Sequence, residues 1–461
     1  MPLILFPMAL LLTSFTNSIA SPSQEEERKI DFSGIVAIES GQLVNYKYLD
    51  GKDYSHQWLQ DNILGLGITT SLHPRLAASI YLAAQIFYNT FPYNINLIGN
   101  PGQVVVGTNL GLCFHKAEMI LNCNPDPQDS LFQIHIGLFP FKYNHEVRNL
   151  GEYLFRSGAY PGYINQEAFD QPFTRLSGIR FSNFLFNCWR NDLFLTSELY
   201  LYPSQDFSLS YVTGVSLANK VIDAGAGISL HHYLSVDNSL TQPLHDDNGN
   251  PANYYLVNGD TLHYSYSGIK LMGRFAVDPK PLFSSTLFGA EDLKLYAEAA
   301  ILGLSNYPAD SSRNDQSKYY GNKFGYNHLL EKMPVMLGLN IPAFKYLDVV
   351  SLEIEYYGKK YPNQVPFPKV GAAMNRYPVP IPPAGSDFNG NYTDATYAAG
   401  PAHWKWSIYA KKTLFNNFNI IGQIARDHCR ILTTLPVNID QEEALVLDKH
   451  WYWMLKFAYE F

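Results

Sequence analysis

Apolar and polar side chains alternate with a period of two residues over most of this chain. In one stretch, Leu64, Leu66 and Ile68 alternate with glycines. A β-strand sends successive side chains to opposite faces, so the pattern predicts strands that each have one apolar face. It predicts about sixteen strands, within roughly fourteen to eighteen. The predicted strands are residues 32–48, 62–72, 75–89, 112–122, 130–138, 174–186, 191–202, 206–217, 220–232, 261–276, 292–303, 333–342, 346–357, 403–412, 417–428 and 450–461, of which 112–122 alternates least regularly.

Charged side chains occupy the phase opposite to several of these apolar stripes. The candidates are Arg180, Glu198, Lys270, Arg274, Glu298 and Glu353. Such charges fit the water-filled interior of a barrel, and they fit the exposed face of a soluble antiparallel sheet equally well. The alternation alone therefore leaves both architectures open.

The lengths of the connections separate the two architectures. Long gaps such as 232–260, 305–331, 359–402 and 429–449 alternate along the chain with short gaps such as 218–219, 342–346 and 413–416. Two gaps depart from the pattern. Residues 277–291 form a gap of medium length where a short one is expected, and residues 204–205 form a tight gap where a long one is expected. This sorting predicts an all-β fold, a transmembrane antiparallel β-barrel with long extracellular loops and short periplasmic turns.

The first 20 residues contain no charged side chain, and Ser18, Ile19 and Ala20 form a small-x-small cleavage site. This predicts a signal peptide over 1–20, although the usual Lys or Arg near the start is missing and a plain apolar terminus is the alternative. Residues 21–31 are then a short periplasmic segment and 32–461 a single barrel. The predicted location is the outer membrane, with lipid as one partner.

The composition of the chain agrees with this architecture. Aromatic residues make up 15% of the 461 residues and charged residues only 16%, against about 25% charged in typical soluble proteins. A barrel with a lipid-facing surface and aromatic girdles uses this mixture. The net charge of -8 argues against a nucleic-acid partner.

The chain ends on a strand whose alternate residues are apolar or aromatic, including Phe457, Tyr459 and Phe461. A terminal Phe with such residues two and four positions before it resembles the C-terminal signal of bacterial outer-membrane β-barrels. That resemblance implies recognition by the outer-membrane assembly machinery. Together with the leader and the sorted loops, the chain resembles a porin-like barrel.

Residues 137–166 resemble the constriction region of porins, where a loop folds inward and narrows the pore. Lys142, Arg148 and Arg156 alternate there with Glu146 and Glu152 among several tyrosines. The resemblance implies that Lys142, Arg148, Glu152 and Arg156 line a pore. The alternative is an ordinary surface loop with local salt bridges.

The predicted function is that of a channel for passive diffusion of small hydrophilic solutes, because about sixteen strands enclose a water-wide lumen. The alternative is a structural or receptor barrel whose lumen is plugged by loops, for example by the Pro-rich insert 360–390. A homo-oligomer fits either reading.

Nothing in the sequence predicts an enzyme, a cofactor or a metal site. The His-x-Ser-Asn-Gly pattern of barrel phospholipases is absent, and the adjacent Asp427 and His428 would point to opposite faces of a strand. The four cysteines include no CxxC pair. Cys113 and Cys123, if they belong to one strand, would lie roughly 33 Å apart and could not form a disulfide.

Overall fold

The computed structural model describes residues 30–45, 53, 55–56, 58–89, 103–105, 110–124, 131–155, 174–186, 188–197, 207–218, 220–234, 254–257, 260–263, 268–283, 286–301, 333–357, 387–388, 404–427 and 449–461. Within these residues the only helix is a single 3-10 turn, Lys280–Leu282. No helix of this part of the chain is long and apolar enough to cross a membrane.

One sheet of seventeen strands dominates the structure, and one of its members, β4 (Gln103–Val105), is a three-residue strand that pairs only with β5. The other sixteen form the wall of a barrel. They are β1 (Ile30–Asn45), β2 (Trp58–His73), β3 (Leu76–Asn89), β5 (Leu110–Asn122), β6 (Phe132–Phe141), β7 (Thr174–Leu185), β8 (Trp189–Ser197), β9 (Phe207–Leu217), β10 (Ile222–Leu234), β13 (Gly268–Val277), β14 (Leu295–Ile301), β15 (Pro334–Asn340), β16 (Val349–Tyr357), β18 (Trp404–Leu414), β19 (Phe418–Arg426) and β20 (Trp451–Glu460).

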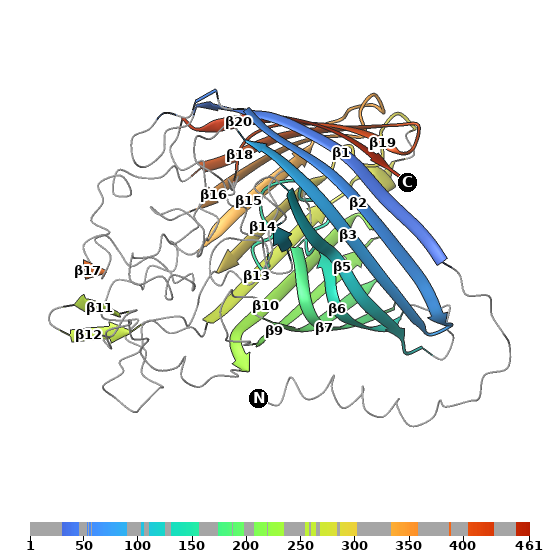
Figure 1. The fold of residues 1–461 in the computed structure, drawn as a ribbon, viewed down its shortest axis with the longest axis vertical. Coiled ribbons are helices and arrows are strands. Elements are labelled where there is room, and N and C mark those ends of the chain that lie inside the picture. Colours follow the sequence, from blue (N-terminus) through green and yellow to red (C-terminus); the bar gives the residue numbers. More distant parts are fainter. Residues whose placement is uncertain are drawn as a thin grey trace.

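The wall is closed because the first strand pairs with the last. β1 lies antiparallel to β20 from Ile35 opposite Glu460 to Asn45 opposite Trp451, and it also pairs with β2. Figure 1 shows β1 and β20 side by side at the top of the barrel. Closure leaves no open sheet edge, so the backbone groups of every wall strand can be paired within the wall.

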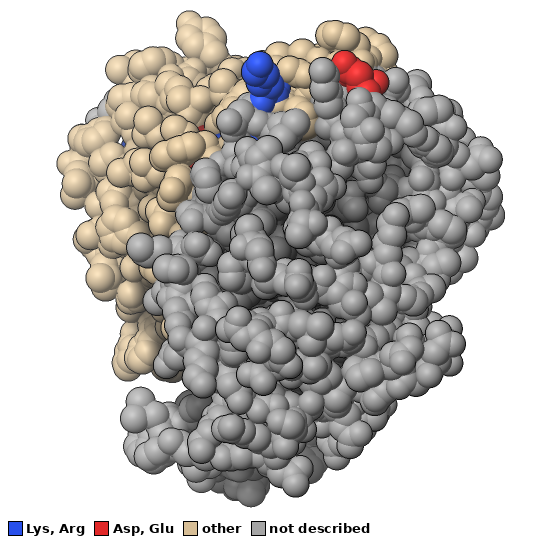
Figure 2. Space-filling model, turned by 90° about the vertical axis from the view of Figure 1, so that its left-hand side faces the viewer, with Lys and Arg blue, Asp and Glu red and all other residues tan. Residues whose placement is uncertain are grey.

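The two faces of the wall differ as the alternation predicts. On β15, Val335, Leu337 and Leu339 are exposed on the outer face, while Met336 and Asn340 are buried on the inner face. The same outward exposure holds for the stripe of Leu64, Leu66 and Ile68 on β2. The part of the wall visible in Figure 2 is almost free of charged residues. The outer face of the barrel is therefore an apolar surface.

Every one of the sixteen predicted strands overlaps a strand of the wall, including 112–122, which corresponds to β5. The prediction for 261–276 is only partly right. Its second part is β13, but Asp260–His263 is β12, which pairs with β11 (Tyr254–Val257) in a separate sheet together with β17 (Asp387–Phe388). Alternation indicates a strand with two unlike faces, and it does not specify the sheet to which the strand belongs.

The connections fall into two sets at opposite ends of the barrel. At one end, called the long-loop end, the strands are joined in sequence by residues 46–57, 90–109, 142–173, 198–206, 235–267, 302–333, 358–403 and 427–450, most of which lie outside the described residues. The short-turn end carries residues 74–75, 123–131, 186–188, 218–221, 278–294, 341–348 and 415–417, of which 278–294 is much the longest. Non-glycine residues such as Ala218, Phe344 and Phe415 have positive φ in these turns, which suits tight hairpins.

Cys123 directly follows β5 and has a free thiol. Cys113 lies within β5, where its backbone is in register with Ala83 of β3. The two cysteines thus belong to the two ends of one strand, as the sequence predicts. Their separation along an extended strand excludes a bond between them.

Candidate functional site

The inner face of the barrel carries a set of buried side chains that can ionise. They are Glu39, Glu118, His135, Arg180, Asp192, Lys270, Glu298, Glu353, Glu355, Lys405, Arg426 and Lys456. Of the residues predicted from strand phase, Arg180, Lys270, Arg274, Glu298 and Glu353 lie on this face, whereas Glu198 lies outside the described residues. The sequence suggested a wet lumen here, but most of these groups are covered. A segment of the chain lies against Glu298, Glu353 and Glu355.

The covering segment consists of residues 142–155, called the inner segment below. It follows β6, and the large apolar side chains of its Val147, Leu150 and Leu154 are fully buried. Together with its aromatic residues they form one hydrophobic cluster with inward-facing residues of the wall. That cluster comprises Phe139, Phe141, Tyr143, Val147, Leu150, Tyr153, Leu154, Phe155, Leu176, Phe194, Val212, Met272, Ala276, Tyr296, Ala300 and Met336. Burial of each large side chain contributes roughly 1.5–3 kcal/mol, so the segment is held inside the barrel.

A tight bend brings the inner segment close to the wall. Gly151 has φ +84° and Glu152 has φ 59°, both in the left-handed region. A Cβ atom at Gly151 would lie 2.9 Å from a carboxylate oxygen of Glu298 and 3.0 Å from the methyl group of Met336. Glycine is therefore required at position 151 both for the bend and for the close approach.

Carboxylates of the wall accept hydrogen bonds from the backbone of the inner segment. Glu353 on β16 accepts from three successive backbone N–H groups. The donors are those of Arg148 (2.6 Å), Asn149 (2.8 Å) and Leu150 (2.9 Å). Three consecutive amides that converge on one carboxylate form an anion-binding nest. The charge of Glu353 is thus used within the protein to hold the segment.

Three further acceptors on the wall complete this attachment. Glu298 on β14 accepts from the backbone N–H of Tyr153 (2.8 Å) and from the side-chain amide of Asn144 (3.2 Å). The hydroxyl of Tyr153 donates to Glu355 on β16 (2.7 Å), and the side-chain amide of Asn149 donates to Ser407 on β18. Glu152 turns back and accepts from the backbone N–H groups of Tyr143 and Asn144. The attachment therefore runs along the wall from β14 to β18.

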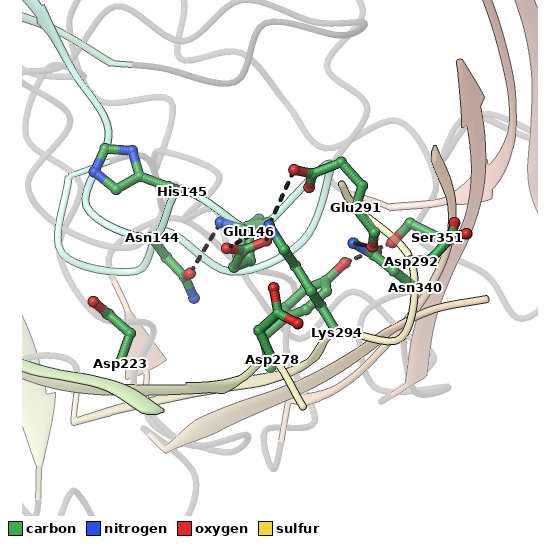
Figure 3. A network of polar contacts seen from close by, with 12 residues as sticks. Asn144, His145, Glu146, Asp223, Asp278, Glu291, Asp292, Lys294, Asn340 and Ser351 are labelled. Atoms are coloured by element: carbon green, nitrogen blue, oxygen red, sulfur yellow. Dashed lines mark hydrogen bonds and ion pairs between the residues drawn. The ribbon is translucent and has the colours of Figure 1, made fainter. Parts of the chain in front are cut away.

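A chain of alternating charges ties the inner segment to the connection 278–294 at the short-turn end. Glu146 lies 3.1 Å from the ammonium of Lys294, Lys294 lies 3.0 Å from Glu291, and Glu291 lies 2.7 Å from the guanidinium of Arg148. Figure 3 shows Lys294 between the two glutamates. A segment that leaves the long-loop end of β6 is thus bonded to a connection at the opposite end of the barrel.

The pKa values in this chain of charges reflect the pairing. Burial alone would disfavour each charge, but the opposite charges beside each group outweigh it. Glu146 and Glu291 together raise the pKa of Lys294, and Glu291 raises the pKa of Arg148. Lys294 and Arg148 in turn lower the pKa of Glu291. All three groups remain ionised at neutral pH, so the ion pairs persist there.

Basic residues gather on the neighbouring part of the wall. Asp192 on β8 pairs with both Arg180 (2.8 Å) and Arg190 (2.9 Å), and Arg274 on β13 pairs with Asp223. The Arg180 guanidinium also lies 5.1 Å from the ring centroid of Phe141, within cation–π range.

From the inner segment, Lys142 donates to the backbone carbonyls of His145 (3.2 Å) and Val147 (2.5 Å). The pKa of His145 is lowered to about 4. Burial of the ring is the main cause, and the nearby cations Arg190, Lys142 and Arg274 add to it, although part of the ring remains open to solvent.

The strands beside the barrel closure have polar pairs of their own. Lys456 on β20 lies 2.6 Å from Glu39 on β1, and both are buried. Asp427 accepts from the hydroxyl of Tyr452 (2.7 Å) and from Gln423 (3.2 Å), so it is a buried acceptor and not an exposed rim residue; His428 lies outside the described residues. In the described part of the chain no cluster of His, Cys, Asp or Glu is placed to bind a metal.

The structure thus brings together several of the predicted site residues and adds others. Lys142, Arg148 and Glu152 lie in the inner segment beside Glu298 and Glu353, whereas Arg156 lies outside the described residues. Sequence reasoning did not name Glu355, Asn144, Asn149, Asp192 or Glu291 as site residues. The Glu-x-Glu spacing of 353 and 355 on one strand face was a usable signal for Glu355. The unusual length of the connection 278–294 was a signal for Glu291.

No protein-family model and no curated protein sequence matches the chain. Solved structures do match. The high-pH structure of Pseudomonas putida OprB aligns over 94% of this chain and 94% of its own, with 10% identity and a TM-score of 0.50. A mutant of the Rhodopseudomonas blastica porin covers 94% of this chain and 100% of its own, with 10% identity and a TM-score of 0.42. The chain therefore has a porin-like fold, a closed antiparallel barrel of sixteen strands.

Proposed function

We propose that the protein is an outer-membrane channel through which small hydrophilic solutes diffuse passively, and that the inner segment narrows it. The observation that carries this proposal is the closed wall with an apolar outer face and a charged inner face. About sixteen strands enclose a lumen wide enough for water, whereas about eight would be filled by side chains. The porin-like fold supports a channel in general.

The passage is proposed to run between the inner segment and the opposite wall. The hydrogen bonds from the segment to the wall go to β14, β16 and β18, and its ion pairs go to the connection 278–294. Its hydrophobic cluster takes wall residues from β6 to β9 and from β13 to β15. The strands β19, β20, β1, β2, β3 and β5 are therefore proposed to form the other side of the passage. Lys142 and Arg148 would border it from the segment, and Arg156 and Glu198 are proposed to extend this lining. Glu152, which the sequence predicted as pore-lining, is only 1% exposed and accepts from backbone N–H groups of the segment instead.

The proposed location is the outer membrane, after removal of residues 1–20. The apolar outer face fits a lipid environment, because polar groups are costly there. Phe457, Tyr459 and Phe461 lie on this face at the closing strand, where assembly machinery could reach them before closure. A homo-oligomer is compatible with this location.

A specific observation favours a second candidate function, a structural or receptor barrel with a plugged lumen. The inner segment covers Glu298 and Glu353, each only 1% exposed, so it fills part of the interior. Apart from β17 (Asp387–Phe388), the insert 360–390, which could add to such a plug, lies outside the described residues.

Single-channel recording in a planar bilayer separates the two candidates. The purified full-length barrel should give discrete, long-lived conductance steps in potassium chloride, and the steps should be smaller than expected for an empty barrel of this width. A preparation that is folded, as shown by its heat-dependent mobility on a gel, but that gives no steps would overturn the channel and leave the plugged barrel. Heat-denatured protein serves as the control for leakage.

A further inference from the structure

Three tight turns at the short-turn end carry a phenylalanine where hairpin turns favour other residues. Phe186, Phe344 and Phe415 have φ of 52°, 50° and 52°, in the left-handed region. Each directly follows the residue whose carbonyl accepts the hydrogen bond that closes its turn. Gly, Asn and Asp are preferred at this position, and a bulky side chain with positive φ is an outlier there. Strain of this kind is typical of positions with a function.

Packing within the described part of the chain does not compensate for this strain at two of the three turns. Phe186 is 84% exposed and Phe415 is 92% exposed. Phe344 is 53% exposed and stacks on Phe288, with the ring centroids 5.7 Å apart. The rings at these tips therefore have a large surface left for a contact outside the chain.

The connection between β13 and β14 widens the apolar surface around Phe344. Its Leu282 and Leu287 are 72% and 67% exposed. Phe288 of the same connection joins Phe344 to the exposed Phe283, whose ring centroid lies 5.9 Å from that of Phe288. Contiguous exposed apolar surface of this kind marks an interaction site.

A buried carboxylate fixes this surface in place. Asp292, only 1% exposed, accepts hydrogen bonds from the backbone N–H groups of Gly289 (2.8 Å), Ala343 (3.0 Å) and Phe344 (3.1 Å). These bonds join the β13–β14 connection to the β15–β16 turn. The apolar side chains therefore stand on an ordered support, so less conformational freedom is lost when they contact a partner.

The two most exposed phenylalanines lie on opposite sides of the barrel. Eight of the sixteen wall strands stand between the turn of Phe186 and the turn of Phe415, namely β8, β9, β10, β13, β14, β15, β16 and β18. Half of the circumference therefore separates the two tips in either direction. A compact protein or a second copy beside the barrel would reach one of these sides only, whereas a bilayer surrounds the whole rim.

The apolar outer face continues to the tips, and the charge beside them is positive. Leu185 and Trp189, which flank the β7–β8 turn, are exposed and have the outward phase of their strands. The tips of the tight turns include Arg75, Lys220 and Lys345 but no Asp or Glu. These tips are residues 74–75, 186–187, 218–220, 343–346 and 415–417. Cations complement the phosphates of phospholipids, and aromatic rings favour the layer between headgroups and acyl chains.

We propose that the turns of Phe186, Phe344 and Phe415 are inserted into the headgroup layer of the membrane leaflet at the short-turn end. The rings enter the boundary between headgroups and acyl chains, and Lys345 meets lipid phosphates. This inference rests on the proposed outer-membrane location and goes beyond it, because turns expected to lie in the periplasm become membrane anchors. Contact of the rings with lipid offsets the strain of the three turns.

Tryptophan fluorescence in vesicles measures the depth of the tips. The full-length barrels Phe186→Trp and Phe415→Trp are reconstituted in phosphatidylcholine with a minority of phosphatidylglycerol. The phosphatidylcholine carries bromine either near the head or near the tail of its acyl chains. Bromine near the head should quench the fluorescence that each variant adds to the parent more strongly than bromine near the tail. Leu337→Trp, in the middle of β15 and 52% exposed, is the matched control and should show the reverse order.

The unfolding temperature gives a second test, which a misfolded variant cannot imitate. The variant with Phe186, Phe344 and Phe415 all changed to Asn should unfold in detergent at the temperature of the parent or above it, because Asn suits the left-handed conformation. Transfer from detergent to vesicles without bromine should raise its unfolding temperature by several degrees less than that of the parent. The control is Ala218→Asn, which places Asn at another left-handed turn residue (φ 50°) but removes no ring. Its gain in vesicles should match that of the parent.

Three results would overturn the insertion. Turn variants that aqueous iodide quenches and brominated lipid does not would place the tips in water. Equal gains in vesicles for the triple Asn variant and for Ala218→Asn would remove any role of the rings in lipid contact. Self-association of the parent in detergent that the triple Asn variant abolishes would assign the tips to a second copy of the chain.

The Leu337→Trp control separates failure of this inference from failure of the proposed location. If brominated lipid does not quench Leu337→Trp, the membrane location itself is wrong. If it quenches Leu337→Trp but neither turn variant, only the insertion of the turns is wrong.

Discussion

Two parts of the inner wall both bury charged residues, yet they use them differently. On β14 and β16, Glu298 and Glu353 accept hydrogen bonds from the backbone of the inner segment. On the strands beside the closure, Glu39 pairs with Lys456 of the next strand. The first part, called the docking wall, holds a separate piece of chain, whereas in the second, called the closure wall, the ion pair joins neighbouring strands of the wall. A buried carboxylate on a barrel wall therefore has a role set by what lies opposite it.

The largest expected effect comes from the docking wall. Replacing Glu353 by Ala removes the acceptor of three backbone N–H groups, and each buried group left without a partner costs about 1–3 kcal/mol. We expect the inner segment to leave the wall and the single-channel conductance to rise severalfold. Limited proteolysis should then cut within residues 142–155, which are protected in the parent.

Glu353→Gln is the matched variant for this prediction. Its one side-chain oxygen can still accept from Asn149 and Leu150, whereas the amide nitrogen in place of the other oxygen cannot accept from Arg148. It should therefore keep more of the protection than Glu353→Ala, with weaker bonds because the charge is lost. Parent-like conductance and protection in Glu353→Ala would show that the hydrophobic cluster around the inner segment holds it without the carboxylate.

The closure wall should respond in the opposite manner. Glu39→Ala leaves the buried ammonium of Lys456 without this partner, and breaking a buried pair on one side typically costs about 3–5 kcal/mol. Thermal unfolding, monitored by the mobility of the protein on a gel, should occur at a clearly lower temperature. The conductance and the proteolytic protection of the inner segment should stay unchanged. A changed conductance in Glu39→Ala would erase the contrast between the two walls.

The wall itself could be predicted from the sequence because its signal is local. Leu337 and Met336 are neighbours, yet the first is 52% exposed and the second fully buried, and such alternation is visible in any short stretch. The same locality explains the error at Asp260–His263. That stretch alternates as a barrel strand would, but its partner is β11 in the small sheet.

The attachments of the inner segment could not be predicted in the same way. Arg148 and Glu353 are 205 residues apart in sequence, and the bond uses a backbone N–H group, which leaves no trace in residue type. The resemblance to a constriction loop indicated that residues 137–166 turn inward. It gave no indication that Glu146 and Arg148 would reach Lys294 and Glu291 at the short-turn end.

A smaller effect on stability is expected from the last residue of the closure. The backbone N–H of Gly34 donates to the carbonyl of Phe461 (2.7 Å), and the N–H of Phe461 donates back (3.0 Å). Deleting Phe461 removes this pair and one half-exposed ring, for which roughly 1.5–3 kcal/mol is an upper bound. The amount of assembled barrel should nevertheless fall sharply, while the thermal unfolding temperature of the purified remainder shifts little. Normal amounts in the membrane would contradict a role for Phe461 as an assembly signal.

The smallest expected effect is a change of conductance at low pH, and it again separates the docking wall from the closure wall. Because the pKa of Glu291 is lowered in the folded protein, its ion pairs stabilise the docked segment fully above its ordinary pKa. That contribution is lost as the pH falls below the ordinary pKa of a glutamate and through the lowered value. Since Glu291 is partly exposed, we expect less than about 1 kcal/mol, seen as a modest rise in conductance on acidification.

Glu291→Gln lacks these ion pairs at every pH, so its conductance at pH 6 should already equal or exceed that of the parent in acid, with a flatter profile between the two. Identical profiles for the parent and Glu291→Gln would assign any acid response to other groups, and the ion-pair chain to the short-turn end would then have no measurable part in docking.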